Sequence, residues 1–250
     1  MNTENLTVLK IGGAVVEDEP SLDRLVRDFA AIPGPKVLVH GGGRSATALA
    51  GQLGVETRMV EGRRVTDDEM LRIVTMVYGG LVNKNIVARL QAAGVNALGM
   101  TGADMDIIRS HRRPLRNDID YGWVGDVERA DGQRLATLIH EGTTPVIAPL
   151  THDGQGHLLN TNADTMAQTV ACALASRFRV TLRFAFEKRG VMRDADDPES
   201  FIPHITEQDF LRLRDEGVVY GGMLPKLENA LQAIRSGVAE VRIGETRITA

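Results

Sequence analysis

The strongest constraint on the fold is the alternation of short apolar segments with longer segments of helical periodicity. Apolar runs occupy residues 6–11, 36–40, 95–100, 145–150, 180–186 and 240–243, and helical patterns lie between most of them. Strands separated by helices predict parallel βαβ units. Because the runs are almost entirely apolar, both faces of the sheet are expected to be buried. The sequence therefore predicts an α/β fold with helices on both sides of a parallel sheet.

Three further segments qualify this pattern. Residues 67–93 have apolar side chains at helical spacing, which predicts one long helix. Residues 57–66 and 121–132 are polar and contain glycine, and we expect each to form a β-hairpin that acts as a flap over a site. We expect a single domain over residues 1–250 with a soft internal division near residue 175.

Composition excludes several classes of protein. The formal net charge is −4, and the short basic clusters carry no aromatic stripe, so no nucleic-acid partner is expected. No apolar run approaches the roughly 18 residues of a membrane span. The single cysteine, Cys172, supports neither a disulfide framework nor a thiol metal site. With no signal pattern at the N-terminus, we expect a cytoplasmic protein.

Two glycine loops follow predicted strands. The stretch 37–45 reads VLVHGGGRS, and residues 10–13 read KIGG. Backbone amides between a strand and a helix form a ready anion site, and the carboxyl ends of neighbouring parallel strands are where such folds bind ligands. Lys10 would add a cation, so the two loops together predict a phosphate site.

The glycine triplet also fits a rival interpretation. Gly41, Gly43 and Ala46 satisfy G-x-G-x-x-A, and Glu61 lies about 20 residues on, as in a dinucleotide-binding fingerprint. That fingerprint normally follows the first strand of its domain, whereas this one follows the second. An NAD-binding oxidoreductase therefore stays open as an alternative, as does a purely structural tight turn.

Three more polar clusters suggest ligand contacts. In NTNADTMA (160–167), Asn162 is a natural N-cap and Asp164 suits the first turn of the following helix. Lys226 falls in the first turn of a helix expected from Met223, where the dipole disfavours a cation, which suggests a bound anion. Arg64 is a candidate bidentate carboxylate clamp, whereas Arg63 is expected to be surface charge. No metal-ligand spacing occurs, so any metal should arrive with a nucleotide.

Taken in order, KIGG, VHGGG, GRRVT, NTNAD and GGMLPK resemble the motifs of the amino acid kinase family over nearly the whole chain. The resemblance implies an open three-layer αβα sandwich with a mainly parallel central sheet. It implies transfer of the γ-phosphoryl group of MgATP to the side-chain carboxylate of N-acetyl-L-glutamate, in arginine biosynthesis. Residues 1–175 would bind the acyl-amino acid and residues 176–250 the nucleotide. A homodimer is also expected.

The same resemblance assigns roles to particular residues. Lys10 and Lys226 would stabilise the transferring phosphoryl group, and Asp164 would orient both lysines. The acyl-amino acid would contact the glycine loop, an arginine and an amide: Gly42, Gly43, Arg64 and Asn160. The nucleotide would lie against glycines and the loop after the fifth apolar run: Gly12, Gly13, Glu187, Lys188, Gly190 and Gly222. Glu187 stands where the family usually has aspartate, so adenine or ribose contacts are expected to differ.

This chemistry agrees with the residues present. A carboxylate nucleophile, with a reference pKa of about 4.3, is already ionised at neutral pH and requires no general base. Positioning and charge stabilisation then carry the reaction. Other acceptors within the family are alternatives, namely N-succinyl-L-glutamate and a carrier-bound aminoadipate. A catalytically silent regulator on the same fold is a further alternative.

Overall fold

The central element is an eight-stranded sheet whose strands come from both ends and the middle of the sequence. The computed structural model describes residues 4–60, 62–185, 189–194, 197–220 and 223–250. In spatial order the strands are β12 (His204–Ile205), β14 (Thr246–Ile248), β13 (Glu240–Ile243), β11 (Arg179–Phe184), β1 (Asn5–Ile11), β2 (Lys36–His40), β8 (Thr144–Ile147) and β5 (Ala97–Met100). All neighbours pair in parallel except β13 and β14. The predicted parallel sheet is therefore confirmed.

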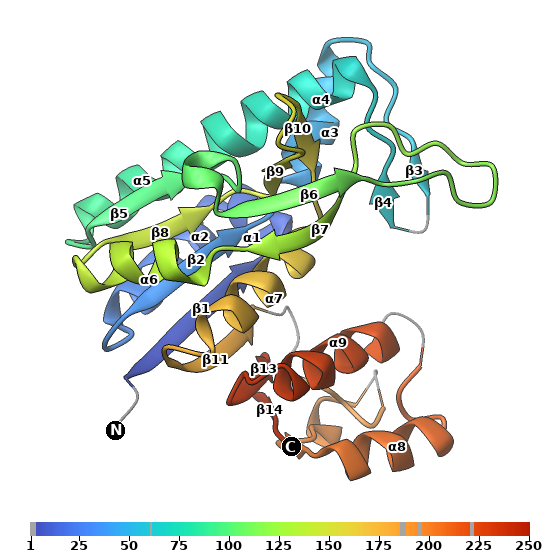
Figure 1. Ribbon diagram of the computed structural model, residues 1–250. Helices are drawn as coiled ribbons and strands as arrows, with labels where there is room; N and C mark the ends of the chain where they lie inside the picture. The colour runs from blue at the N-terminus through green and yellow to red at the C-terminus, as the bar shows by residue number, and fades with distance from the viewer. Residues whose placement is uncertain (1–3, 61, 186–188, 195–196, 221–222) are drawn as a thin grey trace.

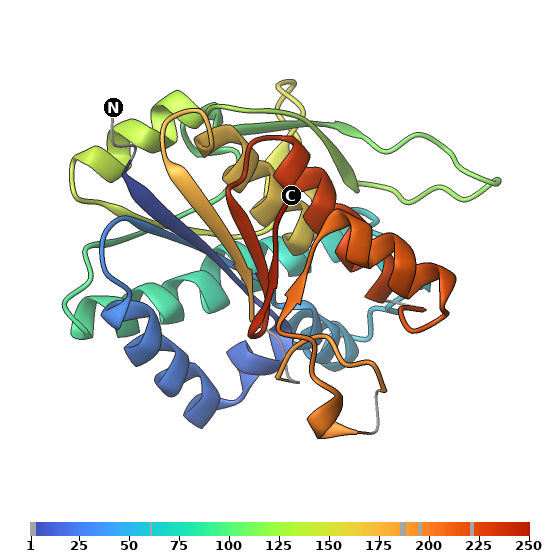
Figure 2. The same cartoon turned by 90° about the horizontal axis from the view of Figure 1, so that it is seen from below.

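Helices cover both faces of this sheet, which confirms the three-layer sandwich (Figure 2). Side chains alternate along β1, so Leu6 and Val8 join one core while Leu9 and Ile11 join the other. The first core includes α6 (Gly132–His140), α7 (Ala163–Leu174), α8 (Glu207–Asp215) and α9 (Met223–Arg235). The second includes α2 (Glu19–Ala31), α3 (Gly43–Gln52) and the helical segment 68–92, and α1 (Gly13–Glu17) joins β1 to α2.

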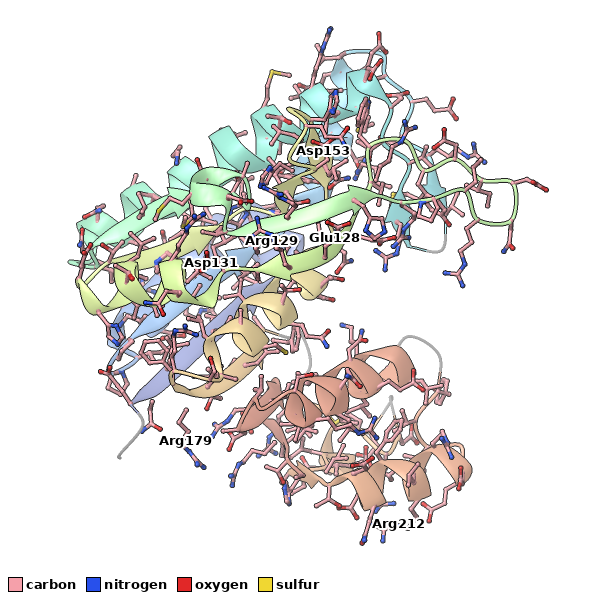
Figure 3. The ribbon with its side chains drawn as sticks, viewed as in Figure 1. Glu128, Arg129, Asp131, Asp153, Arg179 and Arg212 are labelled. Carbon is pink, nitrogen blue, oxygen red and sulfur yellow. The ribbon has the colours of Figure 1, made fainter. Side chains whose placement is uncertain are left out.

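Local capping explains where several helices begin. Asp18 accepts a hydrogen bond from the Ser21 N–H at the start of α2. Asp67 accepts one from the Met70 N–H at the start of α4 (Asp68–Val74). Thr206 and Asp209 form a reciprocal capping box at α8. On the same helix Arg212 pairs with Asp209, and Figure 3 shows its side chain pointing away from α9.

The long helix predicted over 67–93 is continuous but not uniform. After α4 the chain forms a π-helical segment, η1 (Thr75–Val82), and then α5 (Asn83–Ala92). Gly79 and Gly80 lie inside the π-helical turns. A Cβ on Gly79 would lie 3.4 Å from Leu150 Cδ1, which is an ordinary van der Waals contact, so this part of η1 faces the start of β9. Periodicity alone does not distinguish a π-helical insertion from an α-helix.

A second sheet was not predicted. It has four strands in the order β10 (Leu158–Asn160), β9 (Leu150–His152), β6 (Ile108–Arg112) and β7 (Gly125–Ala130). The prediction of a hairpin within 121–132 was wrong, because β7 pairs antiparallel with β6 instead. The apolar run 145–150 also divides between the two sheets, as β8 and the start of β9. The hairpin predicted over 57–66 is confirmed as β3 (Met59–Val60) and β4 (Arg63–Arg64).

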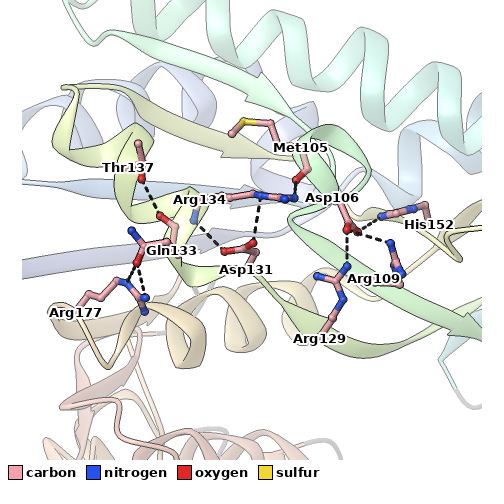
Figure 4. Close-up of polar contacts among 10 residues, drawn as sticks. All are labelled: Met105, Asp106, Arg109, Arg129, Asp131, Gln133, Arg134, Thr137, His152 and Arg177. Carbon is pink, nitrogen blue, oxygen red and sulfur yellow. Dashed lines mark hydrogen bonds and ion pairs between the residues drawn. The ribbon is translucent and has the colours of Figure 1, made fainter.

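Asp106 ties this second sheet together at the end of a short helical turn, η2 (Asp104–Asp106). Its carboxylate accepts from His152 Nε2 at 2.7 Å and from Arg109 Nη2 at 3.0 Å, and it also pairs with Arg129 (Figure 4). These partners come from β9, β6 and β7. A single carboxylate therefore links three strands.

The proposed division near residue 175 falls just after α7. β1 and β11, from either side of it, are neighbours in one sheet. A further short helix, η3 (Pro198–Ser200), precedes β12. Among the described residues, no helix is both long and apolar enough to cross a membrane.

Candidate active site

The loops after β1 and β2 lie against each other, as the sequence predicted. The Gly41 N–H donates to the carbonyl of Ile11 at 2.9 Å. A Cβ on Gly41 would lie 3.3 Å from Gly13 N, and one on Gly13 would lie 3.6 Å from Gly43 N. The close approach of one loop to the other therefore accounts for glycine at position 41, whereas a Cβ on Gly13 would make an ordinary contact. Both loops lie at the carboxyl ends of their strands, which is the edge of the sheet where α/β folds bind ligands.

Gly42 is required for a different reason. Its φ of 166° is extended backbone that any residue adopts. A Cβ there, however, would lie 2.8 Å from Cδ1 of Tyr78, a ring on η1 that is only 5% exposed. Burial raises the pKa of the Tyr78 hydroxyl. Sequence reasoning missed Tyr78, since no local pattern marks a ring that packs on a distant loop.

Arg64 is fixed between the glycine loop and the β3–β4 hairpin. Its Nη2 donates to the carbonyl of Gly43 at 2.8 Å and to Thr47 Oγ1 at 2.9 Å. Its Nη1 makes a longer contact of 3.3 Å with Thr57 Oγ1. The residue is 8% exposed. A guanidinium held in this way is pre-organised for a planar anion.

Asn160 reaches the same place from β10. Its Nδ2 donates to Thr66 Oγ1 at 2.9 Å, and the residue is 8% exposed. Arg64, Asn160 and the loop 41–43 line one cavity of about 190 Å³. The structure thus brings together all four residues that the family resemblance assigned to the acyl-amino acid: Gly42, Gly43, Arg64 and Asn160.

Arg63 corrects a prediction. It was expected to be surface charge, but it is half-buried and lines the same cavity as Arg64. Burial lowers the pKa of Arg63, and the nearby guanidinium of Arg113 lowers it further. The cavity is therefore bordered by two guanidinium groups. The adjacent arginines in the sequence were the available signal, but nothing in the local pattern shows that both border one cavity.

Lys10 and Asp164 form an ion pair at the end of β1. The Nζ of Lys10 lies 2.6 Å from Oδ1 of Asp164, with exposed side-chain fractions of 16% and 36%. Asn162 caps α7 by accepting from the N–H groups of Asp164 and Thr165 at 2.8 and 3.0 Å. This cap fixes the first turn of α7, so the carboxylate of Asp164 faces β1. Orientation of Lys10 by Asp164 is consistent with the geometry.

Lys226 approaches the same carboxylate from α9. Asp164, Lys226 and Phe184 border a small cavity of about 20 Å³. Lys226 is exposed and lies in the first turn of α9. The three residues assigned to phosphoryl transfer, Lys10, Asp164 and Lys226, therefore gather at one place although they come from β1, α7 and α9.

The residues assigned to the nucleotide are only partly described. Gly12 and Gly13 lie in the loop beside Lys10, and a Cβ on Gly12 would lie 3.9 Å from Lys10 Nζ. Gly190 is buried, and a Cβ there would lie 2.5 Å from Thr246 Oγ1. Packing against β14 therefore explains glycine at this position. Glu187, Lys188 and Gly222 lie outside the described residues.

His40 supports the glycine loop and is fully buried. Its Nδ1 donates to the Gly41 carbonyl at 2.7 Å, and its Nε2 accepts from Asn83 Nδ2 at 3.0 Å. Burial lowers the pKa of His40 to about 4, so the imidazole is neutral at physiological pH. Among the described residues, no group of three or more His, Cys, Asp or Glu side chains could hold a metal ion.

Comparison with known proteins shows the family of the chain. The sequence pattern of the amino acid kinase family matches residues 5–245. The acetylglutamate kinase of Bacteroides fragilis is 63% identical over 240 residues, which cover 96% of this chain and 92% of that protein. The acetylglutamate kinase of Cytophaga hutchinsonii is 50% identical over 240 residues, covering 96% and 91%. A crystal structure of smu.665 from Streptococcus mutans has a TM-score of 0.78, 29% identity and 98% coverage of both chains. The chain belongs to the amino acid kinase family.

Proposed function

We propose that this protein transfers the γ-phosphoryl group of ATP to the side-chain carboxylate of N-acetyl-L-glutamate, forming an acyl phosphate. The observation that carries the proposal is the Lys10–Asp164 pair beside two apposed glycine loops, next to a cavity bordered by Arg64 and Asn160. Relatives of 50–63% identity named acetylglutamate kinase support the choice of acceptor. Membership of this family weighs against the oxidoreductase alternative.

In this proposal the acyl-amino acid occupies the cavity of about 190 Å³. Arg64 binds the α-carboxylate, and the long contact between its Nη1 and Thr57 is the one that the ligand replaces. Asn160 and the backbone of Gly42 and Gly43 bind the polar atoms of the acylamide. The side-chain carboxylate then points toward Lys10.

The transfer itself requires charge stabilisation rather than a base. The acceptor carboxylate is ionised at neutral pH, and His40 stays neutral and buried, which agrees with a mechanism without proton abstraction. Lys10 and Lys226 offset the charge on the phosphoryl oxygens as it passes between donor and acceptor. Mg²⁺ commonly binds substrate phosphates with few protein ligands, so we propose that it enters with ATP.

The nucleotide is proposed to lie at the carboxyl end of β11 and β13, beside Lys226. Gly12 and Gly13 then face its terminal phosphates, and backbone amides at such a loop favour an anion. The ribose and base would contact two segments, one that includes Glu187, Lys188 and Gly190 and another that includes Gly222.

Arg63 supports a second acceptor, N-succinyl-L-glutamate. Arg63 is half-buried at the cavity wall. In the proposed complexes it would face the acetyl group of N-acetyl-L-glutamate or the terminal carboxylate of N-succinyl-L-glutamate. A carboxylate would form a charge-assisted hydrogen bond with Arg63, which an acetyl methyl cannot. If so, kcat/KM is higher for the succinyl compound, and Arg63→Gln lowers only that value. Arg58→Gln, at an exposed position before the same hairpin, is the matched control.

A homodimer is also proposed. Met76 and Leu81 on η1 are 54% and 67% exposed, and Leu98 lies on β5, which is the edge strand of the central sheet. Exposed apolar residues beside a sheet edge favour association with another chain.

The proposed reaction is tested by a panel of acceptors. ADP release and hydroxylamine trapping of the acyl phosphate are measured with N-acetylglutamate, N-succinylglutamate, glutamate, aspartate and UMP. We expect hydroxamate with an N-acylglutamate and none with UMP. Absence of hydroxamate with every carboxylate would contradict the proposed reaction, and a nicotinamide-dependent absorbance change would favour the oxidoreductase instead.

A further inference from the structure

A larger cavity lies on the other side of β1 from Lys10. Its volume is about 650 Å³. Its apolar wall includes Leu9 of β1, Leu25 and Phe29 of α2, and Ile32 at the end of that helix. Leu9 and Phe29 belong to the core on the α2 side of the sheet, whereas Lys10 projects to the α7 side. The cavity is therefore separated from the candidate active site by the sheet itself.

The polar wall of this cavity is dominated by arginine. Arg183 of β11, Arg24 of α2 and Arg189 all line it, and the acidic residues there are Asp28 and Glu245. Glu245 is paired with Arg189 at 2.8 Å. Arg24 and Asp28 are exposed on α2, whereas Arg183 is half-buried.

Arg183 belongs to a row of arginines across three neighbouring strands. Arg183 is in register with Arg242 of β13, and Arg242 is in register with Arg247 of β14. The carboxylate of Glu240 lies beside these arginines and forms ion pairs with Arg242 and with Arg247, the latter at 2.9 Å. Like charges at adjacent register positions are destabilising unless an anion lies between them.

The environment of Arg183 leaves its charge poorly compensated. Burial lowers the pKa of Arg183, Arg242 lowers it further, and Glu240 opposes the effect. On the β1 side its register partner is Leu9, an apolar residue. A guanidinium in an otherwise apolar strand costs stability through desolvation, and a bound anion would offset that cost. The arginine that interrupts the apolar run 180–186 thus lies where a ligand can reach it.

We propose that this cavity is a second ligand site, and that it binds a small amphipathic anion. The anionic group, a carboxylate, sulfonate or phosphate, lies between Arg183 and Arg24. The apolar part lies on Leu9, Leu25, Phe29 and Ile32. The guanidinium groups donate charge-assisted, directional hydrogen bonds to the anionic group. The apolar wall buries the apolar surface of the ligand. Tight binding therefore requires both parts of the ligand.

Phe184 borders this cavity as well as the small cavity beside Asp164 and Lys226, and its register with Lys10 and its packing against the α7-side core place its ring on the side of the small cavity. None of the lining residues of the 650 Å³ cavity lines the site that contains Arg64 and Asn160, so a ligand in the second site and the acyl-amino acid are expected to bind at the same time. Ala185 and Gly244 of this cavity lie at the carboxyl ends of β11 and β13, and the nucleotide is expected on the opposite, Lys226 side of the sheet.

The proposal is tested by fluorescence titration of the full chain with anilinonaphthalene sulfonate, an aromatic body carrying one sulfonate. We expect saturable binding that Arg183→Gln weakens by about tenfold or more, because a charge-assisted hydrogen bond is lost. Arg183→Lys keeps the charge and should weaken binding less. Leu25→Trp fills the cavity and should abolish it. Arg27→Gln, at an exposed position on the same helix that does not line the cavity, is the matched control and should bind normally.

Competition experiments distinguish binding at this site from binding at the nucleotide site and from binding that depends on negative charge alone. Saturating MgADP should leave the titration unchanged, and octanesulfonate should compete where sulfate at equal concentration does not. Equal binding by the wild type and the correctly folded Arg183→Gln protein would overturn the proposal, as would displacement by MgADP. Equal competition by sulfate would show that the apolar wall has no role. Circular dichroism of each variant excludes misfolding as the cause of a loss.

Discussion

The Nζ of Lys10 lies 2.6 Å from Oδ1 of Asp164, although the two residues come from the first strand and from a helix more than half the chain away. The cap by Asn162 holds that carboxylate at the start of α7. Asp164→Asn should therefore leave Lys10 without its orienting charge. We expect kcat to fall by about 100- to 1000-fold, as for loss of one preorganised charge contact, with a small change in KM. Steady-state kinetics check this, and a normal kcat in Asp164→Asn would contradict the role of the pair.

Lys226 is exposed, so its replacement should affect catalysis much more than folding. We expect Lys226→Ala to lower kcat by roughly two orders of magnitude or more while the melting temperature stays close to that of the wild type. Glu228→Ala, an exposed position on the same helix, is the control for general effects on α9. A similar loss of kcat in both variants would indicate that helix integrity, not the lysine, is responsible.

Arg64 should act mainly through substrate binding. We expect Arg64→Lys to raise KM for the acyl-amino acid by about tenfold or more, because lysine cannot reproduce the guanidinium fork. Since Arg64 also bonds Gly43 and Thr47, some loss of stability is expected, and thermal melts measure it separately. Arg58→Lys should change neither quantity. An unchanged KM in folded Arg64→Lys would exclude the proposed clamp.

His40 gives the protein a specific pH dependence of stability. The pKa of His40 is about 4 in the folded state, against 6.5 for an unperturbed imidazole, so only the unfolded chain is protonated between those pH values. Unfolded chains then bind more protons, and stability falls as the pH drops through this window by about 1.4 kcal/mol per pH unit. Above pH 6.5 this contribution is constant. Urea unfolding across this range should show a steeper dependence in the wild type than in His40→Gln, and equal slopes would contradict the buried neutral imidazole.

The exposed apolar residues of η1 give a test of association. We expect Leu81→Glu to convert a dimer to monomers in sedimentation velocity, since a charge in an apolar contact is costly to desolvate. Leu53→Glu alters a leucine that is 57% exposed at the end of α3, and it should leave the dimer intact. A wild-type protein that sediments as a monomer at all concentrations would exclude the proposed homodimer.

Local sequence patterns were sufficient for the central sheet and for the loops at its end. Apolar runs and caps such as Asn162 are local signals, and parallel strands place their carboxyl ends at one edge, so the meeting of KIGG with the glycine triplet could be predicted. The gathering of Lys10, Asp164 and Lys226 was identified through motif resemblance, because residues from three elements meet only after packing.

The second sheet could not be predicted in the same way. β6 reads IRSHR, a mostly polar segment whose partner is chosen by tertiary pairing, so β7 was assigned to the wrong hairpin. Arg63 and Tyr78 were missed because their burial depends on how the hairpin and η1 pack on the glycine loop. Arg183 interrupts the apolar run 180–186 of the sequence, but that run does not show the cavity that Arg183 lines.

In the proposed reaction, a carboxylate oxygen bound beside Lys10 accepts the phosphoryl group of ATP. Phosphorus NMR of the protein with MgATP and N-acetyl-L-glutamate measures this transfer most directly. We expect an acyl-phosphate resonance that grows as the γ-phosphate resonance of ATP declines, and that vanishes when hydroxylamine is added. Loss of the γ-phosphate signal to inorganic phosphate alone, or no turnover with any N-acylglutamate, would contradict it.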